Sequence, residues 1–167
     1  MQNQARKTAM LGLFTAMAIV FAYIEVLLPP IFTAIPGIKL GLPNIVIVFM
    51  LYRRGVGDAV AVSVVRILAV SLLVGNFASF AYSVAGGALS LLAMAILKQI
   101  NFLSPVGVSV AGGVLHNVGQ ILMAMLLLGT AELGYYLIVL AVTGTISGIL
   151  VGICGGIAVS RVPSKYI

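Results

Sequence analysis

Apolar residues gather in six stretches along this chain, and short joints rich in proline, glycine and charge separate them. A helix needs about 20 residues to cross the hydrocarbon core of a bilayer. Most of the stretches approach or exceed that length, so the sequence predicts an all-α integral membrane protein. We expect a single transmembrane domain over residues 1–167 that forms a bundle of six helices. The expected helices cover residues 8–28, 42–53, 56–74, 81–98, 104–129 and 133–159.

The second stretch, residues 42–53, is too short to cross a bilayer by itself, because its 12 residues rise only about 18 Å in a helix. Pro43 suits the first turn of a helix, and residues 29–42 before it would then enter the membrane as irregular chain. Such chain is tolerated where it lines a cavity, and interrupted helices mark binding sites in transporters. A strongly tilted or membrane-thinning short helix is the alternative.

Composition and charge agree with a membrane protein. Of the 167 residues, 62% are hydrophobic and 7% are charged, whereas a soluble domain carries roughly 25% charged residues. The net charge is +6, and eight of the nine basic residues flank apolar stretches. This pattern indicates orientation by the positive-inside rule and not a nucleic-acid surface. We expect a multi-pass protein of the cell membrane with both termini in the cytoplasm. Among the basic residues of the loops and termini, only Lys39 would then lie on the outer side of the membrane. The inner basic residues are then Arg6, Lys7, Arg53, Arg54, Lys98, Arg161 and Lys165.

Arg66 differs from the other basic residues because it falls in the middle of an apolar stretch. Placing an arginine there costs at least ~2.5–3.5 kcal/mol, so it should face the interior and find a partner. That partner is either an anionic ligand or a structural ion pair. Glu25, in the outer part of the first stretch, could balance Arg66 or Lys39, be solvated, or contact a ligand.

A polar group of three residues lies near the centre of the fifth stretch. His116, Asn117 and Gln120 are spaced by three and four residues, so they share one helix face. Unpaired polar groups are costly in lipid, and we expect this face to turn inward. It forms either a hydrogen-bonding wall of a ligand cavity or contacts between helices, which are worth about 0.6 kcal/mol each.

Three further candidates for ligand binding, Asn44, Asn76 and Tyr82, lie toward the outer ends of the second to fourth stretches. Tyr82 belongs to a group of aromatic residues at this level. Such residues usually form an interfacial belt, and the alternative is stacking on a flat ligand.

Four glycines recur at intervals of four residues in the last stretch, which places them along one helix face and predicts close helix packing. They are Gly144, Gly148, Gly152 and Gly156. No phosphate-binding GxxxxGK[ST] loop occurs.

Catalytic chemistry has little support in the residues. The three acids, Glu25, Asp58 and Glu132, are far apart along the chain, and Cys154 and His116 are the only cysteine and histidine. We therefore expect no catalytic residues, no metal site, no disulfide and no cofactor, and we interpret the chain as a binding protein and not an enzyme.

Four segments resemble the Gx transporter family, whose members also carry the name heptaprenyl diphosphate synthase component I. They are TAMLGLFTAMAIVFAYIE, PGIKLGLPNIVIVFMLY, SVAGGALSLLAMAIL and GGVLHNVGQ. This family is in turn similar to the substrate-binding S components of energy-coupling factor (ECF) vitamin transporters. Those are six-helix membrane proteins that bind a micronutrient near the outer face and are driven by a T component and two ATPase subunits.

The resemblance implies a partner interface as well as a ligand site. S components contact their T component through small residues spaced by four near the start of the first helix, and Gly12 and Ala16 fit that place, with glycine instead of the usual alanine. Ala5 with Ala9 and Ala18 with Ala22 share this spacing and are the alternative registers. The prenyl-synthase name conflicts with the residues, because prenyl elongation uses aspartate clusters to hold Mg²⁺–diphosphate and this chain has one aspartate.

Together these features predict an S component in the lipid bilayer that takes up a small organic ligand with an anionic group on an apolar or aromatic body. The alternative is an accessory membrane subunit of an isoprenoid-quinone, prenyl diphosphate or extracytoplasmic flavin electron-transfer system. A stand-alone facilitator is a third hypothesis.

Overall fold

The computed structural model describes residues 2–27, 41–74, 77–100 and 102–163, and this part of the chain contains helices and no strand. The helices are α1 (Gln2–Leu27), α2 (Pro43–Arg53), α3 (Val56–Val74), α4 (Phe77–Leu97), α5 (Pro105–Leu128), the 3-10 helix η1 (Glu132–Tyr136) and α6 (Leu137–Arg161). Helices α1, α3, α4 and α5 and the η1–α6 segment are long and apolar enough to cross a membrane. The predicted all-α membrane bundle with a short second helix is confirmed.

Two helices begin earlier than predicted. Helix α1 starts at Gln2 instead of residue 8, and α4 starts at Phe77 instead of residue 81. The prediction for α1 followed hydrophobicity alone, whereas glutamine, alanine, arginine and lysine before the apolar run are good helix formers. The backbone therefore continues as helix beyond the apolar residues.

Local sequence explains the bounds of α5 well. The Ser104 hydroxyl accepts a hydrogen bond from the Gly107 N–H at 3.2 Å, which caps the first turn. Pro105 occupies the first helical position, where a missing N–H has no consequence. Gly129 ends the helix with φ 65°, a left-handed conformation that glycine adopts without strain.

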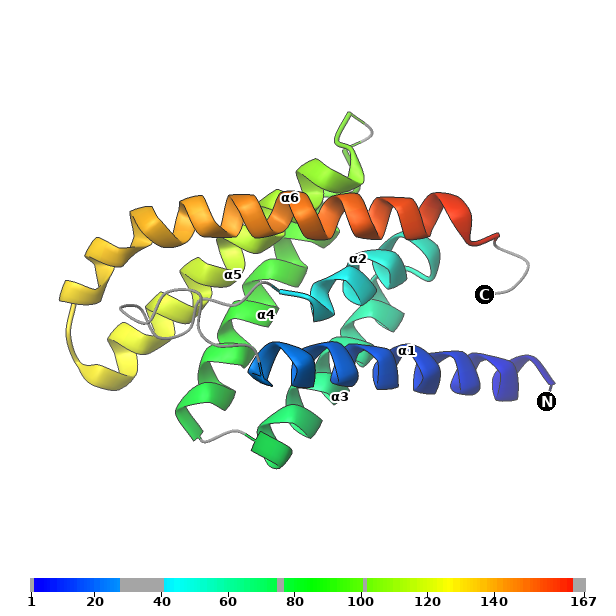
Figure 1. Ribbon diagram of the computed structural model, residues 1–167, viewed down its shortest axis with the longest axis horizontal. Helices are drawn as coiled ribbons and strands as arrows, with labels where there is room; N and C mark the ends of the chain where they lie inside the picture. Colours follow the sequence, from blue (N-terminus) through cyan, green and yellow to red (C-terminus); the bar gives the residue numbers. More distant parts are fainter. Residues whose placement is uncertain (1, 28–40, 75–76, 101, 164–167) are drawn as a thin grey trace.

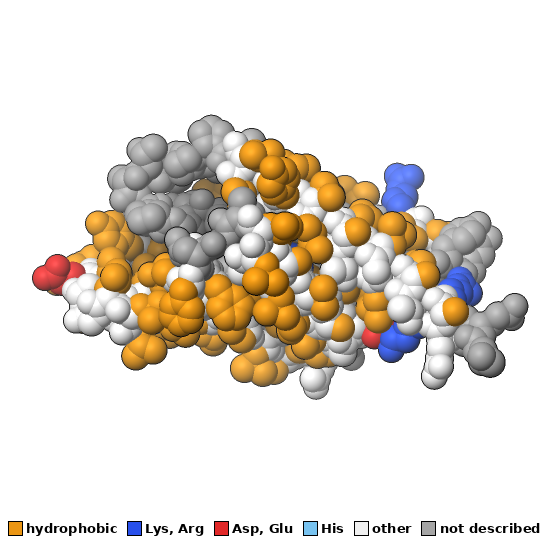
Figure 2. Space-filling view, turned by 90° about the horizontal axis from the view of Figure 1, so that it is seen from below, with side chains coloured by type: hydrophobic (Ala, Val, Ile, Leu, Met, Phe, Trp, Pro, Cys, Tyr) orange, Lys and Arg blue, Asp and Glu red, His pale blue; other side chains and the backbone are white. Residues whose placement is uncertain are grey.

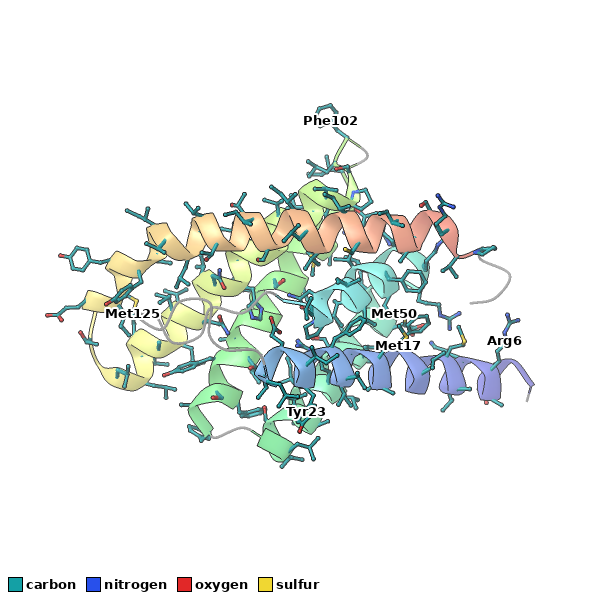
Figure 3. The ribbon with its side chains drawn as sticks, viewed as in Figure 1. Arg6, Met17, Tyr23, Met50, Phe102 and Met125 are labelled. Atoms are coloured by element: carbon teal, nitrogen blue, oxygen red, sulfur yellow. The ribbon has the colours of Figure 1, made fainter. Side chains whose placement is uncertain are left out.

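Helix α2 lies inside the bundle, between α1, α3 and α6 (Figure 1). Its residues from Val46 to Leu51 are all buried, whatever side of the helix they occupy. A helix that is apolar all round belongs in a protein interior, and Met50 accordingly lies in the middle of the bundle while Phe102 lies at its periphery (Figure 3). Protein therefore surrounds this short helix. The predicted irregular segment before it lies almost wholly outside the described residues.

Glycines bring α5 and α6 close together. A Cβ atom on Gly148 would lie 2.6 Å from the Cα atom of Val110, and one on Gly152 would lie 2.6 Å from the Cα atom of Val106. Gly144 meets the backbone of Gly113 in the same way. Three of the four predicted packing glycines thus lie against α5 backbone.

The fourth predicted packing glycine, Gly156, differs from the other three. The nearest atom to a Cβ there would be the Cβ of Pro105, at 3.7 Å, which is an ordinary contact. Helix α5 begins at Pro105, so the glycine stripe of α6 runs past the end of its neighbour. The glycine beside it, Gly155, packs instead against Val48 of α2, with 2.9 Å from its would-be Cβ to the Val48 Cγ1.

Basic side chains gather at one end of the molecule, and an acidic side chain is visible at the other (Figure 2). Two of these basic side chains, Lys7 and Arg54, form salt bridges with Asp58, whose carboxylate oxygens lie 3.0 Å from the Lys7 Nζ and 3.0 Å from the Arg54 Nε. At the same end, Lys98 donates a hydrogen bond of 2.6 Å to the Leu51 carbonyl, and Arg53 donates to carbonyls at the end of α6. The first turn of α1 and the last turn of α6 share this end (Figure 1). Which side of the membrane it faces stays a prediction.

Candidate ligand-binding site

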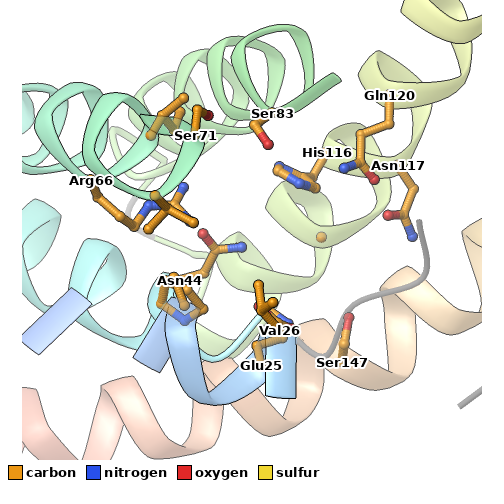
Figure 4. Close-up of a pocket in the computed structure, with 16 residues that line it drawn as sticks. Glu25, Val26, Asn44, Arg66, Ser71, Ser83, His116, Asn117, Gln120 and Ser147 are labelled. Carbon is orange, nitrogen blue, oxygen red and sulfur yellow. The ribbon is translucent and has the colours of Figure 1, made fainter. Parts of the chain in front are cut away.

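A polar cavity lies where all six α-helices or their first turns approach one another (Figure 4). The part that the described residues line has a volume of about 60 Å³. Its polar side chains come from every helix: Glu25, Asn44, Arg66, Ser71, Ser83, His116, Asn117, Gln120 and Ser147. Hydrophilic side chains scattered through an apolar sequence therefore converge on one space.

Six of the predicted ligand-binding residues line this cavity, namely Glu25, Asn44, Arg66, His116, Asn117 and Gln120. Tyr82 is not among the residues that line it, whereas Ser83 next to it is. Successive residues of a helix point about 100° apart, so one position decides which side chain faces the cavity. Lys39 and Asn76, also predicted, lie outside the described residues.

Arg66 supplies the positive charge of the cavity. Its side chain and that of Asn44 extend toward the same space (Figure 4). The Arg66 Nε atom is buried and has no hydrogen-bond partner among the residues that the structure describes. Glu25 is the opposing charge that acts on the guanidinium. A buried donor without an acceptor is costly, so this position favours binding of a further acceptor.

Glu25 also has a structural contact. Its carboxylate accepts a hydrogen bond from the Gly41 N–H, just before α2 begins. Gly41 has φ 75°, where a residue with a side chain would be strained, and its carbonyl accepts a bond of 2.8 Å from the Asn44 N–H. Glu25 therefore ties the end of α1 to the start of α2 and helps to hold Asn44 at the cavity.

The three polar residues of α5 divide into two roles. The Asn117 side chain donates a hydrogen bond of 2.7 Å to the Leu140 carbonyl of α6, so its amide N–H serves contact between helices. His116 and Gln120 lie beside Gly86 of α4, where an added Cβ would be 3.0 Å from the His116 Cε1 and 2.9 Å from the Gln120 Cγ. The absence of a side chain at Gly86 gives these two residues room at the cavity.

Sequence reasoning did not identify the three serines of the cavity. Ser71 follows Ile67 by four residues, and both line the space. Ser83 precedes Gly86 by three residues, and Ser147 follows Gly144 by three residues; both glycines lie in close contact with a neighbouring helix. Serine is common in membrane helices and often bonds to its own backbone, so such spacing gave only a weak signal.

The arrangement is suited to binding an anion. Donors include the guanidinium, the side-chain amides and the serine hydroxyls, and Gly41, Pro43 and Asn44 bring the start of α2 to the cavity wall. The positive end of a helix dipole favours negative charge. Among the described residues, no group of three or more His, Cys, Asp or Glu side chains could hold a metal ion.

Membrane-length apolar helices around a polar cavity define a multi-pass helical membrane protein. The chain belongs to the heptaprenyl diphosphate synthase component I family, which matches residues 14–157. This match confirms the family that the sequence motifs indicated, and it includes every described cavity residue. Comparison with the curated proteins and with the solved structures gave no match.

Proposed function

We propose that the protein is the membrane-embedded S component of an ECF-type importer and binds a small organic anion from the outer face of the cell membrane. The observation that carries this proposal is Arg66, a cation near the middle of the apolar helix α3 whose buried Nε atom lacks an acceptor among the described residues and whose side chain lines the cavity. Arginine at this depth costs at least ~2.5–3.5 kcal/mol. A ligand anion would offset this cost. The Glu25 carboxylate is not devoted to Arg66 alone, because it also accepts a hydrogen bond from the Gly41 N–H.

The surface of α1 supports the partner assignment. Gly12 and Ala16 are both exposed on this helix, and no atom of another element lies within 4 Å of a Cβ built on Gly12. Of the two other pairs with this spacing, Ala18 and Ala22 are buried in the bundle, whereas Ala5 and Ala9 are also exposed. Gly12 and Ala16 thus leave room for close approach by a T component, and two ATPase subunits would supply the energy that this chain has no motif to supply.

Replacement of Arg66 tests the ligand site. A hydrogen bond to a charged group is worth about 1.5–3 kcal/mol, so Arg66→Gln should weaken binding of the ligand roughly ten- to hundredfold. The ligand is first identified by native mass spectrometry of protein purified in detergent, and its affinity is then measured by calorimetry. Arg54→Gln, at the charged end, is the matched control and should bind as the wild type does.

Two results would contradict the ligand assignment. One is a bound compound that is neutral or cationic. The other is an Arg66→Gln variant that loses folding, measured by unfolding in sodium dodecyl sulfate, as much as it loses binding. That second result would assign Arg66 to a structural ion pair with Glu25.

The family name favours a second candidate function, an accessory membrane subunit of prenyl diphosphate or isoprenoid-quinone metabolism. Purification from cells distinguishes the two. An S component should co-purify with a T component and ATPases, whereas an accessory subunit should carry a prenyl ligand and need no ATPase.

A further inference from the structure

The polar cavity contains two opposite charges and one further ionisable ring. Glu25 from α1, Arg66 from α3 and His116 from α5 all line it and lie around the same space (Figure 4). The described residues that α2, α4 and α6 contribute to the wall carry no ionisable side chain. While His116 is neutral, the charges of Arg66 and Glu25 cancel, so the described lining has no net charge before a ligand enters.

This balance matters because the cavity holds little water. Its described part has a volume of about 60 Å³, and a water molecule needs roughly 10–15 Å³ by this measure. Charges in such a space are poorly screened, and a buried charge is costly unless it is paired. An anion at Arg66 would satisfy the Nε atom, but Glu25 already acts on the same guanidinium. The cavity as a whole would then carry one uncompensated negative charge.

A proton would restore the balance, and His116 is the side chain best suited to accept it. It is the only histidine of the chain, and imidazole ordinarily changes its charge near pH 6.5, whereas a glutamate does so near pH 4.3, both values being approximate. The Glu25 carboxylate also accepts the hydrogen bond from the Gly41 N–H. A protonated imidazole donates from both ring nitrogens, so it would give the cavity a second cationic donor.

We propose that the ligand anion binds together with one proton, which His116 takes up from the solvent. The proton adds to the neutral ring nitrogen, and no bond of the ligand is broken. The positive charge gained by the ring equals the negative charge that the ligand brings, so the lining and ligand together stay neutral. This inference rests on the proposed function, since it concerns the anion bound in the same cavity.

Anions that keep their own charge near neutral pH test this proposal. Acetate, benzoate and benzenesulfonate are titrated calorimetrically against the whole protein in nanodiscs of phosphatidylcholine, at about pH 7.5, in buffers with different enthalpies of ionisation. The dependence of the heat on the buffer gives the number of protons taken up, and we expect about one for each anion that binds. From about pH 7 to about pH 8.5 the proton concentration falls roughly thirtyfold, so the affinity should fall about ten- to thirtyfold by linkage.

A spectroscopic measurement follows the proton directly. Because the chain has one histidine, protein labelled with ¹³C-histidine gives the imidazole signals of His116 alone. Addition of benzoate at about pH 7.5 should move these signals to the positions of an imidazolium ring. A histidine that only packs against α4 would keep the signals of a neutral ring.

Two cavity variants and one control separate the charges. His116→Gln keeps a hydrogen-bonding side chain that cannot take up a proton, so proton uptake should be near zero and the affinity independent of pH. Glu25→Gln keeps an oxygen for the Gly41 N–H but removes the opposing charge, so Arg66 alone balances the anion. This variant should take up almost no proton and should bind more tightly than the wild type at about pH 8.5. Glu132→Gln, at an exposed position of η1 outside the cavity, should behave as the wild type does.

The outcomes separate failure of the proton from failure of the anion site. Binding of an anion to the wild type without proton uptake, or uptake that persists in either cavity variant, overturns this inference while the anion site stands. If none of the three anions binds, the anion site and the proposed function fail as well. Should His116→Gln not fold, the buffer series and the histidine signals of the wild type decide the question.

Discussion

Replacing Gly148 by alanine should separate α5 from α6 and destabilise the protein. The new Cβ would lie 2.6 Å from the Val110 Cα and 2.9 Å from the Ser109 carbonyl oxygen. Both are backbone atoms, which cannot move aside as the end of a flexible side chain can. The helices must shift by roughly an ångström, and overpacking of this kind costs about 1–3 kcal/mol.

A second glycine of the same stripe provides the control. At Gly156 the nearest atom to an added Cβ would be 3.7 Å away, so nothing has to move. Alanine is also a better helix former than glycine by about 1 kcal/mol. Gly156→Ala should therefore be as stable as the wild type or slightly more stable.

Unfolding in sodium dodecyl sulfate, followed by far-ultraviolet circular dichroism, measures the free energy of unfolding of both variants. The chain contains no tryptophan, so circular dichroism is preferable to intrinsic fluorescence. Equal stability of Gly148→Ala and the wild type, or equal destabilisation of both variants, would refute the assigned register between α5 and α6.

Two other predictions concern α5 and α1. Asn117→Leu removes the hydrogen bond to the Leu140 carbonyl. We expect the free energy of unfolding to fall by about 0.6 kcal/mol, as for other hydrogen bonds between membrane helices, in the same unfolding assay. The affinity for the ligand should be nearly unchanged. A large loss of affinity would instead make Asn117 a ligand contact. Gly12→Glu, at an exposed position, should abolish co-purification with a T component and leave ligand binding intact, whereas an unchanged complex would remove α1 from the interface.

The helices could be predicted from the sequence because lipid imposes a simple rule: nearly every residue in a span must be apolar. The same rule made Arg66, His116 and Gln120 conspicuous, and the structure places all three at one cavity. Scarcity of polar residues therefore predicted much of the described cavity.

Which side chains face the cavity, and which glycines are in close contact, depends on how the helices pack against one another. The spacing of residues along the sequence does not determine this packing. The choice between Tyr82 and Ser83 follows from the rotation of α4, and the difference between Gly152 and Gly156 follows from where α5 begins. Gly86 and Gly87 are neighbours in the sequence and look alike there. Only the three-dimensional arrangement shows that one makes room for His116 and Gln120 while the other adjoins Ile67.

The enclosure of α2 has a consequence for how the protein is made. This helix emerges from the ribosome before α3, α4 and α5, yet one of its walls is α6, which is synthesised after all three and whose end supplies carbonyls that accept hydrogen bonds from Arg53. Eleven residues are too few to settle across a bilayer unaided. During biogenesis α2 must therefore wait for α6 before its surroundings are complete, so this part of the interior is finished only after α3, α4 and α5 have been synthesised.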